Sequence, residues 1–330
     1  KQVERKESRK EADPEKKAKT ESKRMDTVEA GILELELWMK DIVRQGINQL
    51  QEESYSFFKN ISAKMVDAKA PALAKKIDEL SAIPNSGKDW AERFLEKLSS
   101  IYLIIQGFKN IANLTELLQC DIKTQIGWNY SQEELLKSNG VIDEWVIAGQ
   151  SFEEDNHLKT RKTYLLGQET GKYVLLLDYS FGPKPFDNLE LITGRAFNGE
   201  IVFYPSAYPI RGLIKSKEKM KKEIIFKNAF TSIEKIYSTY SEALSFNPFT
   251  ETIPILLKNI IPVYHDEKLK IIDSEDYFIT TDNKYSDTWL ILAITGGKKA
   301  DIFGEWDGKL FYPLTVIVNN KFYSLNGGRF

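Results

Sequence analysis

The sequence predicts an α+β protein, in which an N-terminal α-helical bundle is followed by an α+β domain built on an antiparallel sheet. Two observations predict this order. In the first part of the chain apolar residues recur at steps of three and four, as in Val28, Ile32 and Leu35, which is the period of an amphipathic helix. After Gly140 short apolar runs alternate with turn dipeptides such as Asp307-Gly308, which is typical of strands joined by hairpins.

Residues 1–26 are expected to form a charged linker that is disordered or loosely helical. The tract contains no Trp, Phe, Tyr, Leu or Ile, so it buries too little apolar area to offset its ordering entropy. Residues 1–24 carry ten Lys and Arg against six Asp and Glu, a net charge of +4, whereas the whole chain has a net charge of −2. The basic excess is therefore local.

Residues 27–140 are expected to form the helical domain. Asp26 with Glu29 supplies an N-cap pattern for the first helix, and Pro71 separates a second helix from a third. Ser131 with Glu134 forms a capping box for a short helix before Gly140. The apolar stripes predict these core positions: Val28, Ile32, Leu35, Met39, Ile42, Val43, Leu50, Phe58, Ile61, Met65, Val66, Leu73, Ile77, Leu80, Trp90, Phe94, Leu98, Ile101, Tyr102 and Ile105.

Residues 141–330 are expected to form the α+β domain, with a β-meander at its C-terminus. Strands are predicted over 145–152, 160–166, 173–179 and 195–204, and one long helix over 216–244. The meander is predicted from strands over 289–295, 300–306, 310–318 and 322–325. Asp307-Gly308 and Asn319-Asn320 suit the positive φ angles of two-residue hairpin turns.

The residue types needed for common catalytic and metal centres are scarce. The chain has one cysteine, Cys120, and two histidines, His157 and His265, which together cannot form a disulfide or a four-ligand zinc site. Gly-x-Gly-x-x-Gly, His-Glu-x-x-His and Gly-x-Ser-x-Gly are absent from the sequence. We therefore expect a protein that is not an enzyme and that binds no cofactor through this chain.

Two acidic residues, Glu305 and Asp307, flank Trp306 at a predicted hairpin tip. An exposed tip lacks the desolvation that raises the pKa of a general acid. Turn formation by Asp307, with Trp306 packed on the sheet, is the simpler interpretation. A hydrolase that uses carboxylates without a recognisable motif remains an alternative.

A lysine cluster lies at the start of the predicted long helix, formed by Lys215, Lys217, Lys219, Lys221 and Lys222. Basic residues oppose the helix dipole at that end, so the cluster suggests attraction to a phosphate backbone or an acidic partner. The alternative interpretation is a solvated face of the helix.

An aromatic and proline-rich segment, which contains Tyr204 and Tyr208 and is followed by Arg211, leaves the fourth strand. Aromatic residues and arginine dominate protein interfaces, but such a segment also suits a rigid corner whose rings fill the core. The candidate interaction residues are therefore Tyr204, Tyr208, Arg211, Lys217, Lys221, Lys222 and Trp306.

Several short motifs, taken in order, resemble the region that follows the finger in bacterial SWIM zinc-finger proteins. They are 28–31 with 35–38, 63–74, Gly127-Trp128, Gly149-Gln150, 203–207 and 304–308. The Cys-x-Cys…Cys-x-His pattern of that family does not occur in this sequence, and the chain starts at Lys1. We therefore expect that a finger, with its zinc, lies upstream in a longer protein or that this member lacks one.

The resemblance implies a cytoplasmic bacterial protein, of a family often associated with MoxR-type AAA+ ATPases and von Willebrand factor A domain proteins. It implies no catalytic residues. The leading hypothesis is a non-catalytic protein-interaction or adaptor module with such a partner. The alternative is a nucleic-acid-binding accessory module that uses the basic segments 1–24 and 215–222. No small-molecule substrate and no membrane association are expected.

Overall fold

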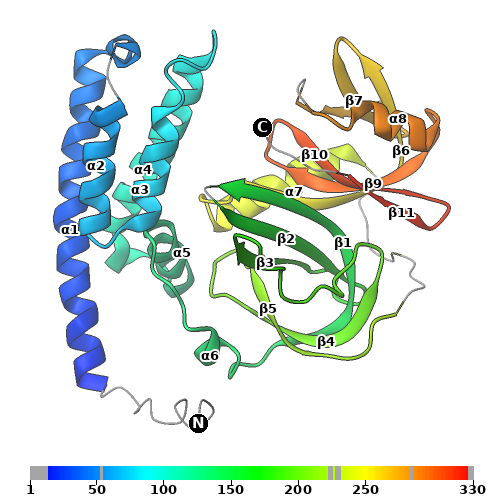
Figure 1. Cartoon of the computed structure of the whole chain (residues 1–330), viewed down its shortest axis with the longest axis horizontal. Helices are drawn as coiled ribbons and strands as arrows, with labels where there is room; N and C mark the ends of the chain where they lie inside the picture. Colours follow the sequence, from blue (N-terminus) through cyan, green and yellow to red (C-terminus); the bar gives the residue numbers. More distant parts are fainter. Residues whose placement is uncertain are drawn as a thin grey trace. The chain divides into compact units, whose positions relative to one another are not determined.

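The computed structural model describes residues 14–52, 55–155, 157–221, 226, 232–282 and 285–325. The chain divides into two compact units, Lys1–Asn129 and Tyr130–Phe330. The first unit is helical, and every strand of the described residues lies in the second, where all paired strands run antiparallel (Figure 1). The α+β fold predicted from the sequence is confirmed.

The first unit consists of α1 (Pro14–Gln45), η1 (Ile47–Gln51), α2 (Tyr55–Asp67), α3 (Pro71–Ser81), α4 (Trp90–Lys109), η2 (Ile111–Asn113) and α5 (Glu116–Ile126). Two of these helices have clear sequence signals at their ends. Pro71 is the first residue of α3, where its missing N–H is not needed. The Thr115 side chain accepts a hydrogen bond from the Leu118 N–H at the start of α5, and Gly127, with a φ of 117°, ends it.

Helix α1 begins at Pro14, so the predicted helix start at Asp26 is wrong, and of the two alternatives for the linker, residues 14–26 are helical rather than disordered. Most of these residues are Lys, Glu, Ala, Arg or Met, which favour helix even without an apolar stripe. The Arg24 guanidinium lies 4.1 Å from the ring of Trp128 and donates to the Gly127 carbonyl. This contact stabilises the early turns. Residues 1–13 of the expected linker lie outside the described residues.

The core of the helical unit follows the apolar stripes of α1, α2, α3 and α4. A Cβ at Gly31 would lie 2.4 Å from the Cβ of Ala68, so glycine permits α1 to approach the end of α2 closely. Three predicted core residues are at the surface instead: Val43, Val66 and Tyr102 are 59%, 53% and 40% exposed. They lie at the edges of their apolar stripes, where the period of the sequence does not define how wide the buried face is.

The second unit begins with α6 (Gln132–Leu135), capped by Ser131 as predicted. The first sheet has the order β3-β2-β1-β4-β5, formed by β1 (Val141–Asp155), β2 (Leu158–Gly167), β3 (Tyr173–Phe181), β4 (Ala196–Phe203) and β5 (Gly212–Lys217). Strands β3 and β5 are the two edges of this sheet, and the sheet curls enough to bring them together. The N–H of Leu175 in β3 donates to the carbonyl of Ile210, just before β5, at 2.8 Å. Asn198-Gly199 lies within β4 and makes no turn.

The second sheet has the order β11-β10-β9-β6-β7-β8. Its strands are β6 (Ile253–His265), β7 (Lys268–Ile272), β8 (Phe278–Thr280), β9 (Ala300–Trp306), β10 (Phe311–Val318) and β11 (Lys321–Ser324). Helices α7 (Ile233–Phe246) and α8 (Thr288–Thr295) pack on it through Ile236, Ala243 and Ile291. The predicted hairpins at 307–308 and 319–320 are therefore present, whereas β6, β7 and β8 were not predicted.

Two predicted elements of this unit are wrong. Residues 216 and 217 belong to β5, and the helix begins only at Ile233; residues 222–225 and 227–231 of the predicted long helix lie outside the described residues. Residues 289–295, predicted as a strand, form most of α8. Its run of β-branched and aromatic residues favours a strand, but Gly296, with a φ of 59°, supplies a helix C-cap.

The two sheets meet through a shared core. The ring of Tyr164 in β2 lies 5.7 Å from that of Phe303 in β9, and the Leu256 N–H donates to the Tyr173 hydroxyl. A Cβ at Gly149 would lie 2.6 Å from a ring atom of Phe303. Close approach at this glycine is therefore part of the packing between the sheets.

Candidate interaction groove

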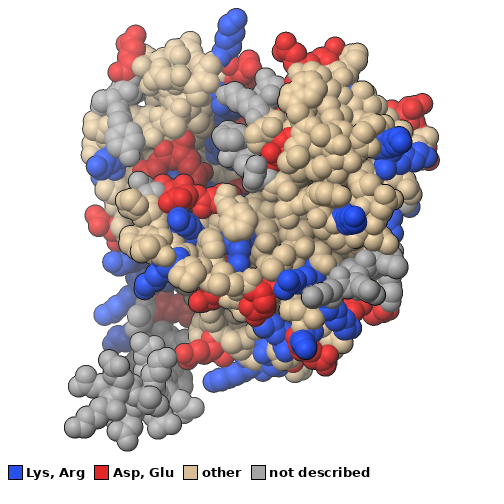
Figure 2. Space-filling view, turned by 45° about the vertical axis from the view of Figure 1, so that its right-hand side comes forward, with Lys and Arg blue, Asp and Glu red and all other residues tan. Residues whose placement is uncertain are grey.

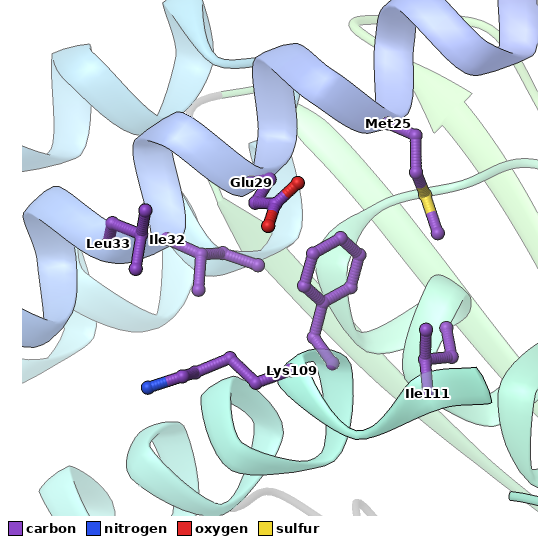
Figure 3. A pocket seen from close by; sticks show the side chains of 7 residues that line it. Met25, Glu29, Ile32, Leu33, Lys109 and Ile111 are labelled. Carbon is purple, nitrogen blue, oxygen red and sulfur yellow. The ribbon is translucent and has the colours of Figure 1, made fainter. Parts of the chain in front are cut away.

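An apolar groove runs along the surface between α1 and α4 of the helical unit. It contains two hollows, which we call the lower and upper pockets of the α1–α4 groove. The lower pocket, of about 280 Å³, is lined by Met25, Glu29, Ile32 and Leu33 of α1 and by Phe108, Lys109 and Ile111. In Figure 3, Met25 and Ile111 point toward the opening from opposite walls. The upper pocket, of about 400 Å³, is lined by Met39, Lys40, Val43 and Arg44 of α1 and by Leu95, Leu98, Ser99 and Tyr102 of α4.

Helical spacing explains why both pockets share one groove. From Met25 to Arg44 the α1 lining residues recur at steps of three and four, with one longer step that Glu36 fills. Residues spaced in this way lie on one face of a helix. The α4 residues follow the same rule from Leu95 to Lys109. The two pockets therefore lie one after the other along the same side of α1 and α4.

A charged network separates the two pockets. The Glu36 carboxylate, 5% exposed, accepts hydrogen bonds from Gln106 Nε2 at 3.1 Å and from Lys109 Nζ at 2.9 Å, and it pairs with Lys40 Nζ at 3.0 Å. The Lys109 and Lys40 ammonium groups hold the pKa of Glu36 down, at about 2. Glu36 is thus ionised and its charge is already compensated by its neighbours. The network ties α1 to α4 beneath the groove.

The α4 wall of the groove carries no charge over most of its length. No Asp, Glu, Lys or Arg occurs from Leu98 to Phe108, although Tyr102 and Leu103 are both exposed. Exposed faces of helices in soluble proteins are normally charged. The large apolar side chains that α4 exposes are Leu95, Tyr102 and Leu103, and a group of exposed apolar side chains can mark a contact surface.

The predicted lysine cluster is not at a helix start. Lys215 and Lys217 are in β5, Lys221 follows it, and Lys222 lies outside the described residues. Each of the first three pairs with an acid: Lys215 with Glu200 at 2.9 Å, Lys217 with Glu190, and Lys221 with Glu144 at 2.8 Å. On the face drawn in Figure 2, basic and acidic side chains lie interspersed. Lys215, Lys217 and Lys221 therefore provide little uncompensated positive charge.

The aromatic candidates are mostly part of the interior. The Arg211 guanidinium lies 4.3 Å from the ring of Tyr204, which is buried, and Tyr208 packs against the core of the second sheet. Burial raises the pKa of Tyr208. Trp306 is 1% exposed and its ring contacts that of Tyr237 edge-on. Tyr204 and Trp306 are thus not available at the surface, and the segment from Tyr204 to Arg211 forms a packed corner.

Glu305 also differs from the sequence-based expectation of an exposed tip. Its side chain is 4% exposed and accepts a hydrogen bond from the Tyr164 hydroxyl across the two sheets. Asp307 has the turn role that was predicted, since its Oδ1 accepts from the N–H groups of Lys309 and Leu310. No local motif signals the Tyr164–Glu305 contact, because the two residues are far apart in the chain.

The described residues offer no candidate metal centre and no candidate membrane span. Within these ranges, no group of three or more His, Cys, Asp and Glu side chains is arranged to hold a metal ion. Nor does any helix of the described part of the chain have the length and apolar character needed to cross a bilayer. The sequence analysis did not predict the α1–α4 groove. The charge-free run of α4 is the one sequence signal that could have indicated it.

One comparison with known proteins gives a match, in the helical part of the chain. Residues 23–126 match the family model of the SWIM-associated four-helix bundle domain. The match runs from within α1 to the last residue of α5. No curated protein and no solved structure matches the chain significantly. The resemblance found in the sequence motifs is thus confirmed for the unit that carries the groove.

Proposed function

We propose that this chain, whose residues 23–126 match the model of the SWIM-associated four-helix bundle domain, is a non-catalytic protein-interaction module that docks a partner protein in the α1–α4 groove. The observation that carries the proposal is the pair of pockets between α1 and α4, which are lined mainly by apolar side chains. Soluble proteins retain such surfaces mainly where another molecule covers them.

The proposed partner is the one that the resemblance implies, a MoxR-type AAA+ ATPase or a von Willebrand factor A domain protein, in the bacterial cytoplasm. Nucleic-acid binding has less support, because Lys215, Lys217 and Lys221 are compensated by carboxylates. Phosphate contacts would first have to break those pairs. The proposal assigns this chain no catalytic step.

Val43 and Val66 offer a matched pair of variants for the test. Both are more than half exposed on surface helices, but only Val43 lines the groove. We expect Val43→Asp to lower the recovery of the partner about tenfold, because docking would remove a carboxylate from water in place of an apolar side chain. The measurement is quantitative mass spectrometry of proteins that copurify with the tagged full chain from its host.

Val66→Asp is the control, and it should recover as much partner as the unchanged chain does. Circular dichroism of both variants checks that the helices are intact. A partner recovered equally well with Val43→Asp and Val66→Asp would show that the groove is not the docking site.

A further inference from the structure

Strand β1 is longer than its neighbour β4, so its second half has a strand on only one side. Pairing with β4 covers residues 141–146 of β1, and it ends with the backbone bonds that join Ile147 to Gly194 and Arg195. Over residues 149–155, β1 pairs with β2 alone among the described strands. We call this stretch the β1 edge.

The register of the β1–β2 pair shows which backbone groups of the β1 edge point outward. The Gly167 N–H donates to the Lys172 carbonyl on the β3 side at 2.9 Å, so the odd-numbered residues of β2 face β3 and the even-numbered ones face β1. The β1 residues opposite even-numbered residues of β2 are Gly149, Ser151, Glu153 and Asp155. Gln150, Phe152 and Glu154 alternate with them, so their N–H and C=O groups point away from β2. In the described part of the chain, no backbone bond to another segment uses these groups.

Such a row of backbone groups is matched by another extended strand, and a second copy of this chain offers the same row. Two copies of the edge can pair antiparallel across a twofold axis, so that one surface meets itself. With the axis at Phe152, Gln150 opposes Glu154 of the second copy, and Phe152 opposes Phe152. Every outward residue of one edge then faces an outward residue of the other, in hydrogen-bonded pairs.

The three acids at the end of the β1 edge favour this register. Glu153, Glu154 and Asp155 are exposed, and with the axis at Phe152 each opposes an uncharged residue of the second copy. Those uncharged residues are Ser151, Gln150 and Gly149, in that order. With the axis at Glu154, by contrast, Glu154 would oppose itself and Glu153 would oppose Asp155. Like charges directly opposite one another destabilise a strand pair.

We infer that the β1 edge joins two copies of this chain into a dimer, through an antiparallel pair of β1 strands centred on Phe152. The Phe152 side chain is 55% exposed, so the two rings at the axis supply an aromatic cross-strand contact. The pairing is short, and we expect the dimer only at high protein concentration. A twofold pair closes on itself and adds no third chain. This surface is separate from the α1–α4 groove of the proposed function.

The test is sedimentation equilibrium of the full chain at increasing concentration. Phe152→Lys and Phe152→Glu each place like charges opposite one another at the axis. Each variant alone should raise the dissociation constant of the dimer about tenfold. An equimolar mixture of the two variants should associate more tightly than either alone, because Lys then opposes Glu. Only a contact in which residue 152 meets itself predicts this recovery.

Two further variants separate the edge from general effects of substitution. Tyr179→Lys is the matched control, since Tyr179 is 54% exposed on β3 of the same sheet but lies outside the β1 edge, and it should leave the dissociation constant unchanged. Glu154→Pro removes an outward N–H and keeps the bonds to β2, so it should weaken the dimer while Phe152 is still present. Circular dichroism checks that every variant is folded.

A chain that stays monomeric up to its solubility limit would overturn the inference. So would a dimer that Tyr179→Lys weakens as much as Phe152→Lys does, or a mixture of the Lys and Glu variants that associates no better than each alone. A dimer lost in Val43→Asp but not in Phe152→Lys would assign self-association to the α1–α4 groove instead. Recovery of the host partner by the Phe152 variants tests the proposed function independently, because that function does not use the β1 edge.

Discussion

At the scale of single residues, Glu36 shows how burial and charge combine in this protein. It lies on α1 among apolar residues, nearly inaccessible to solvent, and binds three polar side chains. Burial alone would raise its pKa, but the hydrogen bonds from Lys109 and Lys40 outweigh that effect and lower it to about 2. The ionised form is therefore the one that stabilises the fold.

Glu36→Gln should destabilise the helical unit in a way that depends on pH. A carboxylate whose pKa falls from 4.5 to about 2 on folding contributes stability that is fully present above pH 4.5 and lost as the pH falls toward 2. We expect a loss of about 1–2 kcal/mol at pH 7, because the lysines are partly exposed. Urea unfolding at pH 7, 4 and 2.5 measures it. A difference between variant and wild type that stays constant over this range would contradict the role given to Glu36.

The burial of single residues was the least predictable feature of the sequence. Val43 and Tyr102 belong to apolar stripes but line open pockets, whereas Glu305 lies beside a turn but is buried. Trp306 is packed on the sheet, as the sequence indicated. Period and residue type define which residues share a face, but they do not define where a neighbouring element stops covering that face.

At the scale of elements, the segment 182–195 illustrates how a loop without regular structure is held in place. It covers one face of the first sheet, where the buried Arg161 of β2 donates to the carbonyls of Asp187 and Asn188 and pairs with Asp178 at 2.8 Å. Gln150 Nε2 also donates to the Leu191 carbonyl. A planar guanidinium suits several acceptors at once, so one arginine fixes most of the loop.

Arg161→Lys should loosen this loop and leave the second sheet unchanged. An ammonium group cannot reproduce the forked contacts, and we expect a cost of about 2–4 kcal/mol. Hydrogen exchange followed by mass spectrometry should show at least tenfold faster exchange over 182–195, with β9 unaffected. Lys162→Met, which removes the more exposed pair with Glu153 on the same strand, is the control. Unchanged exchange over the loop in Arg161→Lys would argue against this anchoring.

Elements with strong end signals were predictable, and elements defined by their tertiary contacts were not. The hairpin at Asp307-Gly308 and the helix at Pro71 have local chemistry that leaves few alternatives. Helix α8 has an uninterrupted apolar sequence, which is compatible with a strand or a helix. Strand β6 pairs with β9 at one end and with β7 at the other. No local sequence pattern identifies either strand as its partner.

At the scale of the whole molecule, the order of a helical part followed by a sheet-containing part was predictable, because it depends on period alone. The division into units falls after Asn129. Each unit has its own buried core, with Leu80 fully buried in the first and Leu257 in the second. The candidate groove was not predictable as a site, because it is formed by the relation between two helices rather than by any motif.

The two units should unfold separately. Leu80→Ala and Leu257→Ala remove the same side chain from equally buried positions, and each should cost about 2–5 kcal/mol. We expect calorimetry of the full chain to show two transitions, with each variant lowering the temperature of only its own. A single transition shifted by both variants would mean that the cores are coupled.

The bond between Leu175 and Ile210 has a consequence for self-association. It joins β3 to the segment before β5, so both outer strands of the first sheet already use part of their backbone donors and acceptors within the sheet. Such strands are poor templates for pairing with another chain. The second sheet instead ends at β8, only three residues long, and at β11. If strands of this protein aggregate on partial unfolding, the growing fibril should start from β11 rather than from the curled sheet.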